Sequence, residues 1–312
     1  MKEDEKVYVA GHTGLVGSAI VRALKERGFR NLALVPHGQI DLCDQRATKD
    51  FFASEKPDYV FFAAGRVGGL QANNTRRAEF ITDNIQMQTN VLVSAWKTGV
   101  KKLLYLGSNC AYPKECEQPM NEEALFTGRL EPTNQPFAVA KLAGIEMCNA
   151  FSRQYGARFI SVIPASLFGP RDNYGLVNSH IVPTLIRRCH EAKKEDLESI
   201  SISGSRERRR ELLYVDDLAQ ACLFLMDTYE SPDPINVGTG RDYSVGEIAE
   251  VVRQTVGYKG RVFFDITKPS GMMRKLLDSS KIKGLGWQPR VSLEEGMVLA
   301  YEGFLSQISE KN

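Results

Sequence analysis

The chain has 312 residues, which is enough for one large domain or two unequal ones with a substantial core. Forty basic and 38 acidic residues give a net charge of +2, too balanced to indicate a nucleic-acid or membrane-surface partner. No apolar run approaches the roughly 18 residues of a membrane span, and the charged start Met1–Lys6 predicts no secretory signal.

The cysteines are scattered along the chain and form no Cys-x-x-Cys pair. This pattern predicts free thiols in a reducing cytoplasm, and it predicts no zinc site or other metal site. The six residues are Cys43, Cys110, Cys116, Cys148, Cys189 and Cys222.

Strands and helices alternate in the first half of the chain. Apolar runs predict strands at Lys6–Ala10, Leu32–Val35, Tyr59–Ala64, Lys102–Leu106 and Arg158–Ile163. Periodic segments predict helices at Ser18–Arg27, Asp44–Glu55, Thr75–Thr98 and Pro136–Tyr155. Because the strands are apolar on both faces, the pattern predicts an α/β fold with a doubly wound parallel sheet covered by helices on both sides.

After Pro164 the regular alternation of predicted strands and helices ends. A helix at Ile181–Ala192 is followed by a polar stretch to Ser205 without predicted structure. Further helices are expected at Asp216–Asp227, Gly246–Val256 and Val291–Gln307, with a strand at Ile235–Val237. We therefore expect a dinucleotide-binding domain in residues 1–165 and a smaller, mainly substrate-binding region in residues 166–312, some of whose segments return to the first domain.

A glycine-rich loop separates the first predicted strand from the first predicted helix. Gly11, Gly14 and Gly17 follow the spacing G-x-x-G-x-x-G. Glycine permits the tight turn and the close approach of backbone to a pyrophosphate, whose charge the helix N-terminus stabilises. In the first unit of an alternating α/β chain, this spacing predicts a Rossmann dinucleotide site.

The residues after the second strand decide which dinucleotide is preferred. An acidic residue there would favour NAD, and an arginine would favour NADP. This chain has Val35-Pro36-His37, in which His37 is either a contact for a 2′-phosphate or an ordinary loop histidine. The loop sequence does not choose between the two cofactors.

Blocks along nearly the whole chain resemble the GDP-L-fucose synthase family of extended short-chain dehydrogenase/reductases. The first blocks are Ala10–His12 with Gly17–Ala19, Val67–Gly69, Ala72–Thr75, Leu106–Cys110 and Tyr112–Lys114. The later ones are Glu131–Asn134 before the Phe137/Lys141 helix, Gly169–Pro170, Asn178–His180, Tyr214–Asp217 and Arg274–Asp278.

The resemblance implies epimerisation at C3 and C5 of a GDP-linked 4-keto-6-deoxy sugar, followed by NADPH-dependent reduction at C4. Cys110 and His180 are then the pair that moves protons, Ser108 binds the C4 oxygen, and Lys141 holds the nicotinamide ribose. Cysteine and histidine both exchange protons near neutrality after modest tuning of their pKa values. Arg188, Arg210 and Arg274 are the expected contacts to the nucleotide-sugar.

The cofactor contacts that the resemblance implies lie in the glycine loop, after the second strand and beside the nicotinamide. They are Gly11, Thr13, Gly14, Leu15, Val16, Gly17, His37, Lys141, Pro164 and Leu167. Several positions depart from the family pattern, including Thr13 and His37 in place of arginines. The resemblance implies NADP as the cofactor, and the missing arginines leave NAD as the alternative.

Phe137 is the departure with the clearest chemical consequence. It stands four residues before Lys141, where the family has the tyrosine that exchanges a proton with the C4 oxygen. A phenyl ring has no such proton, so C4 reduction is expected to be weakened or altered unless another hydroxyl, from Tyr112 or Tyr174, substitutes. Further departures lie near cofactor and sugar, at Asn109, Ser166 and Ser203.

Four interpretations follow from these residues. The protein is an epimerase with weakened reduction, an epimerase only, a cofactor-binding homologue without catalysis, or an engineered Tyr-to-Phe variant of a full epimerase-reductase. The other departures favour a divergent natural enzyme. The resemblance also implies a homodimer paired through the Thr75–Thr98 and Pro136–Tyr155 helices.

Overall fold

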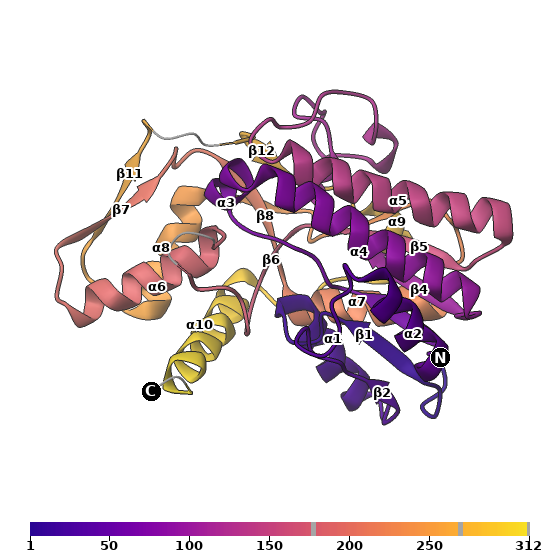
Figure 1. Cartoon of the computed structure of the whole chain (residues 1–312). Coiled ribbons are helices and arrows are strands. Elements are labelled where there is room, and N and C mark those ends of the chain that lie inside the picture. Colours follow the sequence, from indigo (N-terminus) through magenta and orange to yellow (C-terminus); the bar gives the residue numbers. More distant parts are fainter. Residues whose placement is uncertain (176–178, 268–270, 311–312) are drawn as a thin grey trace.

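The centre of the fold is a six-stranded sheet whose strands are all parallel (Figure 1). The computed structural model describes residues 1–175, 179–267 and 271–310. The strand order is β2-β1-β3-β4-β5-β9, which confirms the predicted doubly wound sheet. The strands are β1 Val7–Ala10, β2 Leu32–Ala33, β3 Tyr59–Phe62, β4 Lys102–Leu106, β5 Phe159–Pro164 and β9 Ile235–Val237.

Helices cover both faces of this sheet. The chain moves one way along the sheet from β1 to β2 and the other way from β2 to β5, so right-handed crossovers put α1 on one face and α2, α4 and α5 on the other. Helix α7 packs against α1, and α4 packs along α5. The bounds are α1 Leu15–Glu26, α2 Gln45–Glu55, α4 Arg77–Lys97, α5 Gln135–Tyr155 and α7 Val215–Thr228.

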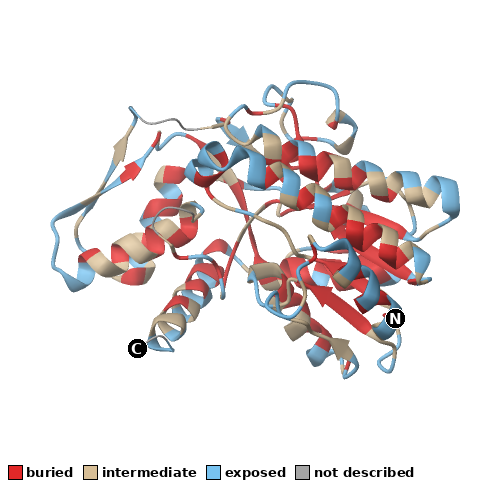
Figure 2. Cartoon of the chain, in the orientation of Figure 1, coloured by how far each residue is buried: buried red, intermediate tan, exposed pale blue. Residues whose placement is uncertain are grey.

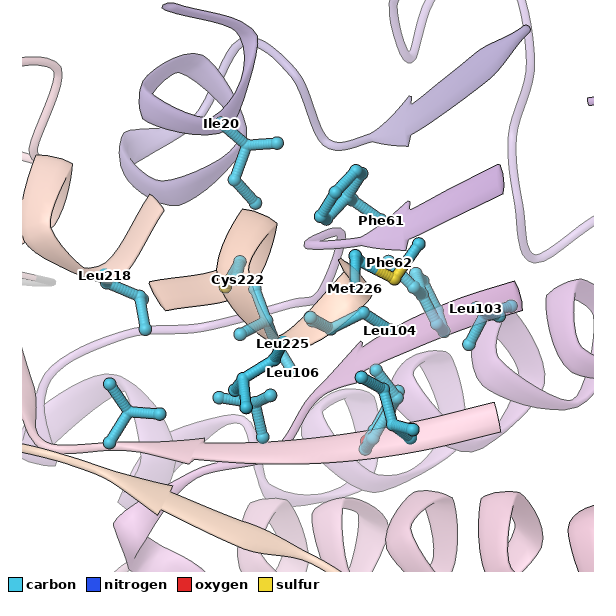
Figure 3. Packing of buried hydrophobic residues seen from close by; sticks show 14 of the residues in the cluster. Ile20, Phe61, Phe62, Leu103, Leu104, Leu106, Leu218, Cys222, Leu225 and Met226 are labelled. Atoms are coloured by element: carbon cyan, nitrogen blue, oxygen red, sulfur yellow. The ribbon is translucent and has the colours of Figure 1, made fainter. Parts of the chain in front are cut away.

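Two clusters of buried apolar side chains form the core (Figure 2). The larger cluster surrounds the six-stranded sheet, and it includes Ile20 of α1, Leu218 of α7, Phe61 of β3 and Leu104 of β4 (Figure 3). The smaller cluster lies among helices of the second half, and it includes Phe168, Leu185, Val252 and Phe304. Segments after residue 166 contribute to both clusters, because α7 and β9 pack with the main sheet.

The second half of the chain forms small sheets packed on helices. Strand β8 pairs with β10, β12 and β6, and β7 pairs with β11. These strands are β6 Ser166–Phe168, β7 Ser199–Ser203, β8 Arg209–Tyr214, β10 Asp242–Ser244, β11 Arg261–Asp265 and β12 Arg274–Lys275. The helices are α6 Ile181–Lys194, α8 Val245–Val256, α9 Ser280–Gly284 and α10 Leu293–Ser309.

Two sequence-based expectations are wrong in detail. The helix predicted at Thr75–Thr98 is α4, which begins only at Arg77, and a short helix that was not predicted, α3 Leu70–Thr75, precedes it and ends where Arg76 leaves the helical region with φ −113° and ψ 43°. The polar stretch before Ser205 contains β7, which is stabilised by a partner strand, β11, some sixty residues away. Asn178 of one family block lies outside the described residues.

The strand order places a ligand crevice at one edge of the sheet. The connections that leave β1 and β3 run in opposite directions along the sheet, so the switch point lies between these two neighbouring strands. Ligands of open α/β sheets bind outside the carboxyl ends of the strands at such a point. The glycine loop follows β1 and Ser108 follows β4, so both lie at this edge. Over the described ranges, no helix has the length and apolar character that crossing a membrane requires.

Candidate active site

The glycine loop brings backbone unusually close to backbone. Gly11 has φ +80°, and a Cβ atom on Gly17 would lie only 2.1 Å from the Gly11 carbonyl oxygen. The Gly14 N–H donates to that same oxygen at 3.0 Å, and α1 begins at the next residue. A larger residue at position 17 would push the turn away from the helix, so the loop requires glycine there. The exposed N-terminus of α1 is thus open to an anion.

The other predicted cofactor residues lie around the same edge of the sheet. Thr13 and Gly14 are exposed in the loop, and Leu15 and Val16 are half-buried in the first turn of α1. His37 is exposed in a turn closed by the Gln39 N–H and the Pro36 carbonyl. Pro164 ends β5, and Leu167 lies in β6.

Lys141 is a buried cation beneath this edge. Its ammonium group donates to the carbonyl oxygen of Leu106 at 2.8 Å and lies 4.9 Å from the centre of the Tyr105 ring. Burial lowers the pKa of Lys141 to about 8. The group is therefore held in place by β4, and it changes charge close to neutral pH.

Phe137 lies one turn before Lys141 on α5, as the spacing predicts. Its ring is 8% exposed and packs edge-to-face against Phe80, with the ring centres 6.2 Å apart. The Lys141 ammonium lies 5.8 Å from the Phe137 ring centre. Position 137 thus offers an apolar ring in a small apolar cluster with Ala72 and Phe80.

The two tyrosines considered as substitutes use their hydroxyls elsewhere. Tyr112 is fully buried and donates to Asn236 Oδ1 at 2.7 Å. Tyr174 is 9% exposed and donates to the Ala300 carbonyl at 3.0 Å. Ser108, by contrast, is half-buried at the end of β4, where its hydroxyl oxygen accepts from the Cys110 N–H at 3.2 Å.

The Cys110 thiol is surrounded by hydrogen-bond donors. Asn134 donates its amide N–H to Sγ at 3.1 Å, and Lys275 donates from its ammonium group at 3.3 Å. Burial alone would raise the pKa of Cys110. The Lys275 charge, hydrogen bonds with Ser108 and Lys275, and the Arg210 charge outweigh that effect and lower the pKa.

His180 lies at the N-cap of α6, where its carbonyl accepts from Thr184. Its side chain keeps an open face to solvent. The protein atoms around the ring and the Lys275 charge together lower its pKa. Lys275 therefore acts electrostatically on both Cys110 and His180. No role is predicted for Lys275 from the sequence, although this residue stands inside the matching block Arg274–Asp278.

The three predicted arginines have different environments. Arg210 donates to the carbonyls of Met272 and Met273, and burial together with the Arg208 charge lowers its pKa to about 10. Arg274 is paired with the Asp242 carboxylate at 2.5 Å.

Arg188 lies apart from the other two arginines, on the side of α6 that faces β7. It donates to the Ser201 carbonyl beside an open pocket of about 290 Å³. Of the three predicted arginines, only Arg210 is close enough to affect the Cys110 charge.

Comparisons with known proteins agree with this architecture. The model of the NAD dependent epimerase/dehydratase family matches residues 7–238. GDP-L-fucose synthase 1 of Arabidopsis thaliana is 50% identical, over 98% of this chain and 95% of its own length. GDP-L-fucose synthase of Escherichia coli K12 is 46% identical, over 96% of this chain and 97% of its own.

Solved structures show the same arrangement. A GDP-6-OMe-4-keto-L-xylo-heptose reductase from C. jejuni has a TM-score of 0.93 at 36% identity, covering 98% of this chain and 99% of its own. A GDP-L-fucose synthetase from Naegleria fowleri, bound to NADP, has a TM-score of 0.91 at 28% identity. The match covers 99% of this chain and 96% of the synthetase chain.

Proposed function

This chain belongs to the GDP-L-fucose synthase family within the NAD dependent epimerase/dehydratases, and we propose from that premise that it epimerises a GDP-4-keto-6-deoxy sugar with weakened C4 reduction. The protein is an enzyme of the GDP-sugar epimerase/reductase class. Its cofactor is NADP(H): the Naegleria fowleri relative is bound to NADP, and the structure of a relative from Campylobacter jejuni was obtained in the presence of NADPH. The glycine loop fits the pyrophosphate of such a dinucleotide, because the N-terminus of α1 is exposed and the glycines let the backbone approach it closely.

The proton-transfer step is assigned to Cys110 and His180. A 4-keto group acidifies the C–H bonds of both neighbouring carbons, and inversion needs a base on one face and an acid on the other. The lowered pKa of Cys110 raises the fraction of the group that is thiolate, and the thiolate is the form that acts as a base. We assign the hydrogen bond to the C4 oxygen during enolisation to the Ser108 hydroxyl, two residues after the end of β4.

The observation that carries the proposal is the contrast between Phe137 and Cys110. Around Phe137 the contacts are apolar, and no hydroxyl stands next to Lys141 on that turn of α5. Around Cys110 two donors approach the sulfur. Bound NADPH supplies a hydride for C4, but the oxygen formed there also needs a proton. Without a positioned acid, we expect C4 reduction to be slower by roughly 10²- to 10⁴-fold.

The test uses the wild-type protein with GDP-4-keto-6-deoxymannose in deuterated water. Mass spectrometry should find deuterium at C3 or C5, while NADPH absorbance at 340 nm falls slowly. Cys110→Ser should abolish most of the exchange, and Cys116→Ser, a half-buried thiol elsewhere, should leave it unchanged. Absence of exchange in the wild type contradicts the proposal, and NADPH binding without exchange or oxidation favours a non-catalytic homologue.

We also propose that two chains pair through α4 and α5. These helices pack along each other on one face of the sheet, and Val139 of α5 is 36% exposed. Light scattering coupled to size exclusion should give twice the monomer mass of 34.8 kDa. A monomer at micromolar concentration contradicts this assembly.

A further inference from the structure

We propose that Lys275 is a positioning residue that holds Cys110 as a thiolate, with Asn134 as the second donor on the sulfur. This inference rests on the proposed epimerisation, in which Cys110 is the base, and it adds the residue that stabilises the charged form of that base. Lys275 itself does not touch the reacting carbon in this scheme, and it acts through Cys110.

The Lys275 ammonium group lies beside the Cys110 sulfur. Lys275 lies on β12 opposite Arg210 of β8, and this pairing brings it to the thiol although 165 residues separate the two in sequence. Its Nζ atom is 3.3 Å from Cys110 Sγ and 3.4 Å from Asn109 Oδ1. Within the described ranges, no carboxylate forms an ion pair with Lys275. The thiolate is therefore the anion that this half-buried ammonium can pair with.

Asn134 is a second hydrogen-bond donor to the Cys110 sulfur. Asn134 lies at the N-cap of α5 and points its amide N–H at Sγ from 3.1 Å, while its Oδ1 atom is buried without a partner. A thiol is a weak acceptor, but a thiolate accepts strongly from two donors. Two donors aimed at one sulfur stabilise its charged form.

The charges around the Cys110 thiol are positive. Lys275 of β12 and Arg210 of β8 supply this charge, and burial together with Lys275 disfavours the cationic form of His180 at the start of α6. The contacts from the start of α5 are neutral, namely Asn134 at its N-cap and Phe137 in its first turn. One lysine thus favours both the thiolate and the neutral imidazole, so its removal shifts both groups toward their protonated forms.

The experiment measures thiolate formation directly. Wild type and Lys275→Met are treated with iodoacetamide between pH 5 and 10, and mass spectrometry follows the peptide that contains Cys110. Since thiolate is the reactive form, labelling at pH 7 should slow by about tenfold or more in Lys275→Met. Lys275→Arg should label close to the wild-type rate.

Two controls separate charge from structure. Lys49→Met removes an exposed lysine from α2 and should leave labelling of Cys110 unchanged. Cys43, whose pKa burial raises to about 11, is an internal reference that should label slowly in every variant. Lys275→Gln repeats the test with a polar side chain, and a wild-type melting temperature verifies folding. Superimposable pH profiles for Cys110 in wild type and a folded Lys275→Met or Lys275→Gln overturn the proposal.

Labelling needs neither substrate nor cofactor, so this result is independent of the proposed reaction. Slow labelling in Lys275→Met, together with no deuterium exchange in the wild type, would retain the Lys275–Cys110 pair and remove the epimerase function. Deuterium exchange in the wild type, together with identical Cys110 labelling profiles in wild type and Lys275→Met, would retain the epimerase function and remove the proposed role of Lys275. When both proposals hold, the pH dependence of exchange in Lys275→Met shifts toward higher pH.

Discussion

The Lys141 ammonium lies 5.8 Å from the centre of the Phe137 ring, one helical turn away on α5. At that distance the lysine faces an aromatic surface instead of a hydroxyl whose acidity it could tune. Lys141 is anchored on β4 through the Leu106 carbonyl, so its own position does not depend on residue 137. The proton supply for C4 reduction can therefore be altered without moving the lysine.

Restoring the hydroxyl should restore the reduction. We expect Phe137→Tyr to raise the rate of NADPH oxidation with the 4-keto sugar by about 10²- to 10⁴-fold, because a positioned acid is worth that much. Stopped-flow absorbance at 340 nm measures the rate. Phe137→Leu, which changes the packing against Phe80 but adds no acid, should give no increase. Equal rates in Phe137→Tyr and wild type would mean that another group already protonates the oxygen.

Lys141 should make stability depend on pH between about 8 and 10. Burial lowers the pKa of Lys141 to about 8, below the roughly 10.4 of an unfolded lysine. Between these values the unfolded chain binds the proton and the folded chain does not, so stability rises with pH. Relative to Lys141→Met, the wild type should gain about 2–3 kcal/mol of unfolding free energy from pH 7 to pH 10.

Urea unfolding of both proteins at the two pH values measures this gain. Comparing the two proteins cancels the other groups that titrate in the same range. A constant difference between wild type and Lys141→Met would contradict the lowered pKa.

Glu211 should be a structural support of the strand that carries Lys275. This buried carboxylate accepts from the backbone N–H of Gly240 at 2.7 Å and of Leu277 at 2.8 Å. Glu211→Ala leaves both N–H groups unpaired, and it should lower the unfolding free energy by about 2–4 kcal/mol. Glu207→Ala, at an exposed position, should change it by less than about 0.5 kcal/mol in the same urea titration. Equal losses in the two variants would contradict this role.

Arg210 should bind the GDP moiety more strongly than Arg274. The Arg274 guanidinium is already paired with Asp242, whereas Arg210 meets only carbonyl oxygens among the described residues. We expect Arg210→Met to raise the Kd for GDP about tenfold to a hundredfold, since a hydrogen bond to a charged group is worth roughly 1.5–3 kcal/mol. Arg274→Met should raise it less than about threefold. Calorimetric titration with GDP measures both, and the reverse order would contradict the assignment.

Features set by neighbouring residues were predictable from the sequence. The glycine loop, the strand β4 and the α5 helix depend on local patterns, so the sheet and the Phe137–Lys141 relationship followed from spacing. Features set by distant pairing were not. The short strands β7 and β12 become strands through partners far along the chain, and the Lys275–Cys110 contact depends on β12. Helix α3 was not predicted because it is short and contains Asn73, Asn74 and Thr75, which are weak helix formers.

The most direct test of the central claim counts two events in one sample. The wild-type protein is mixed with GDP-4-keto-6-deoxymannose and NADPH in deuterated water. Deuterium incorporated at C3 and C5 is then compared with NADPH consumed over the same time. With Cys110 prepared as a base and Phe137 in place of an acid, exchange should exceed oxidation by about 10²-fold or more. Oxidation that keeps pace with exchange, or oxidation without exchange, would contradict the account.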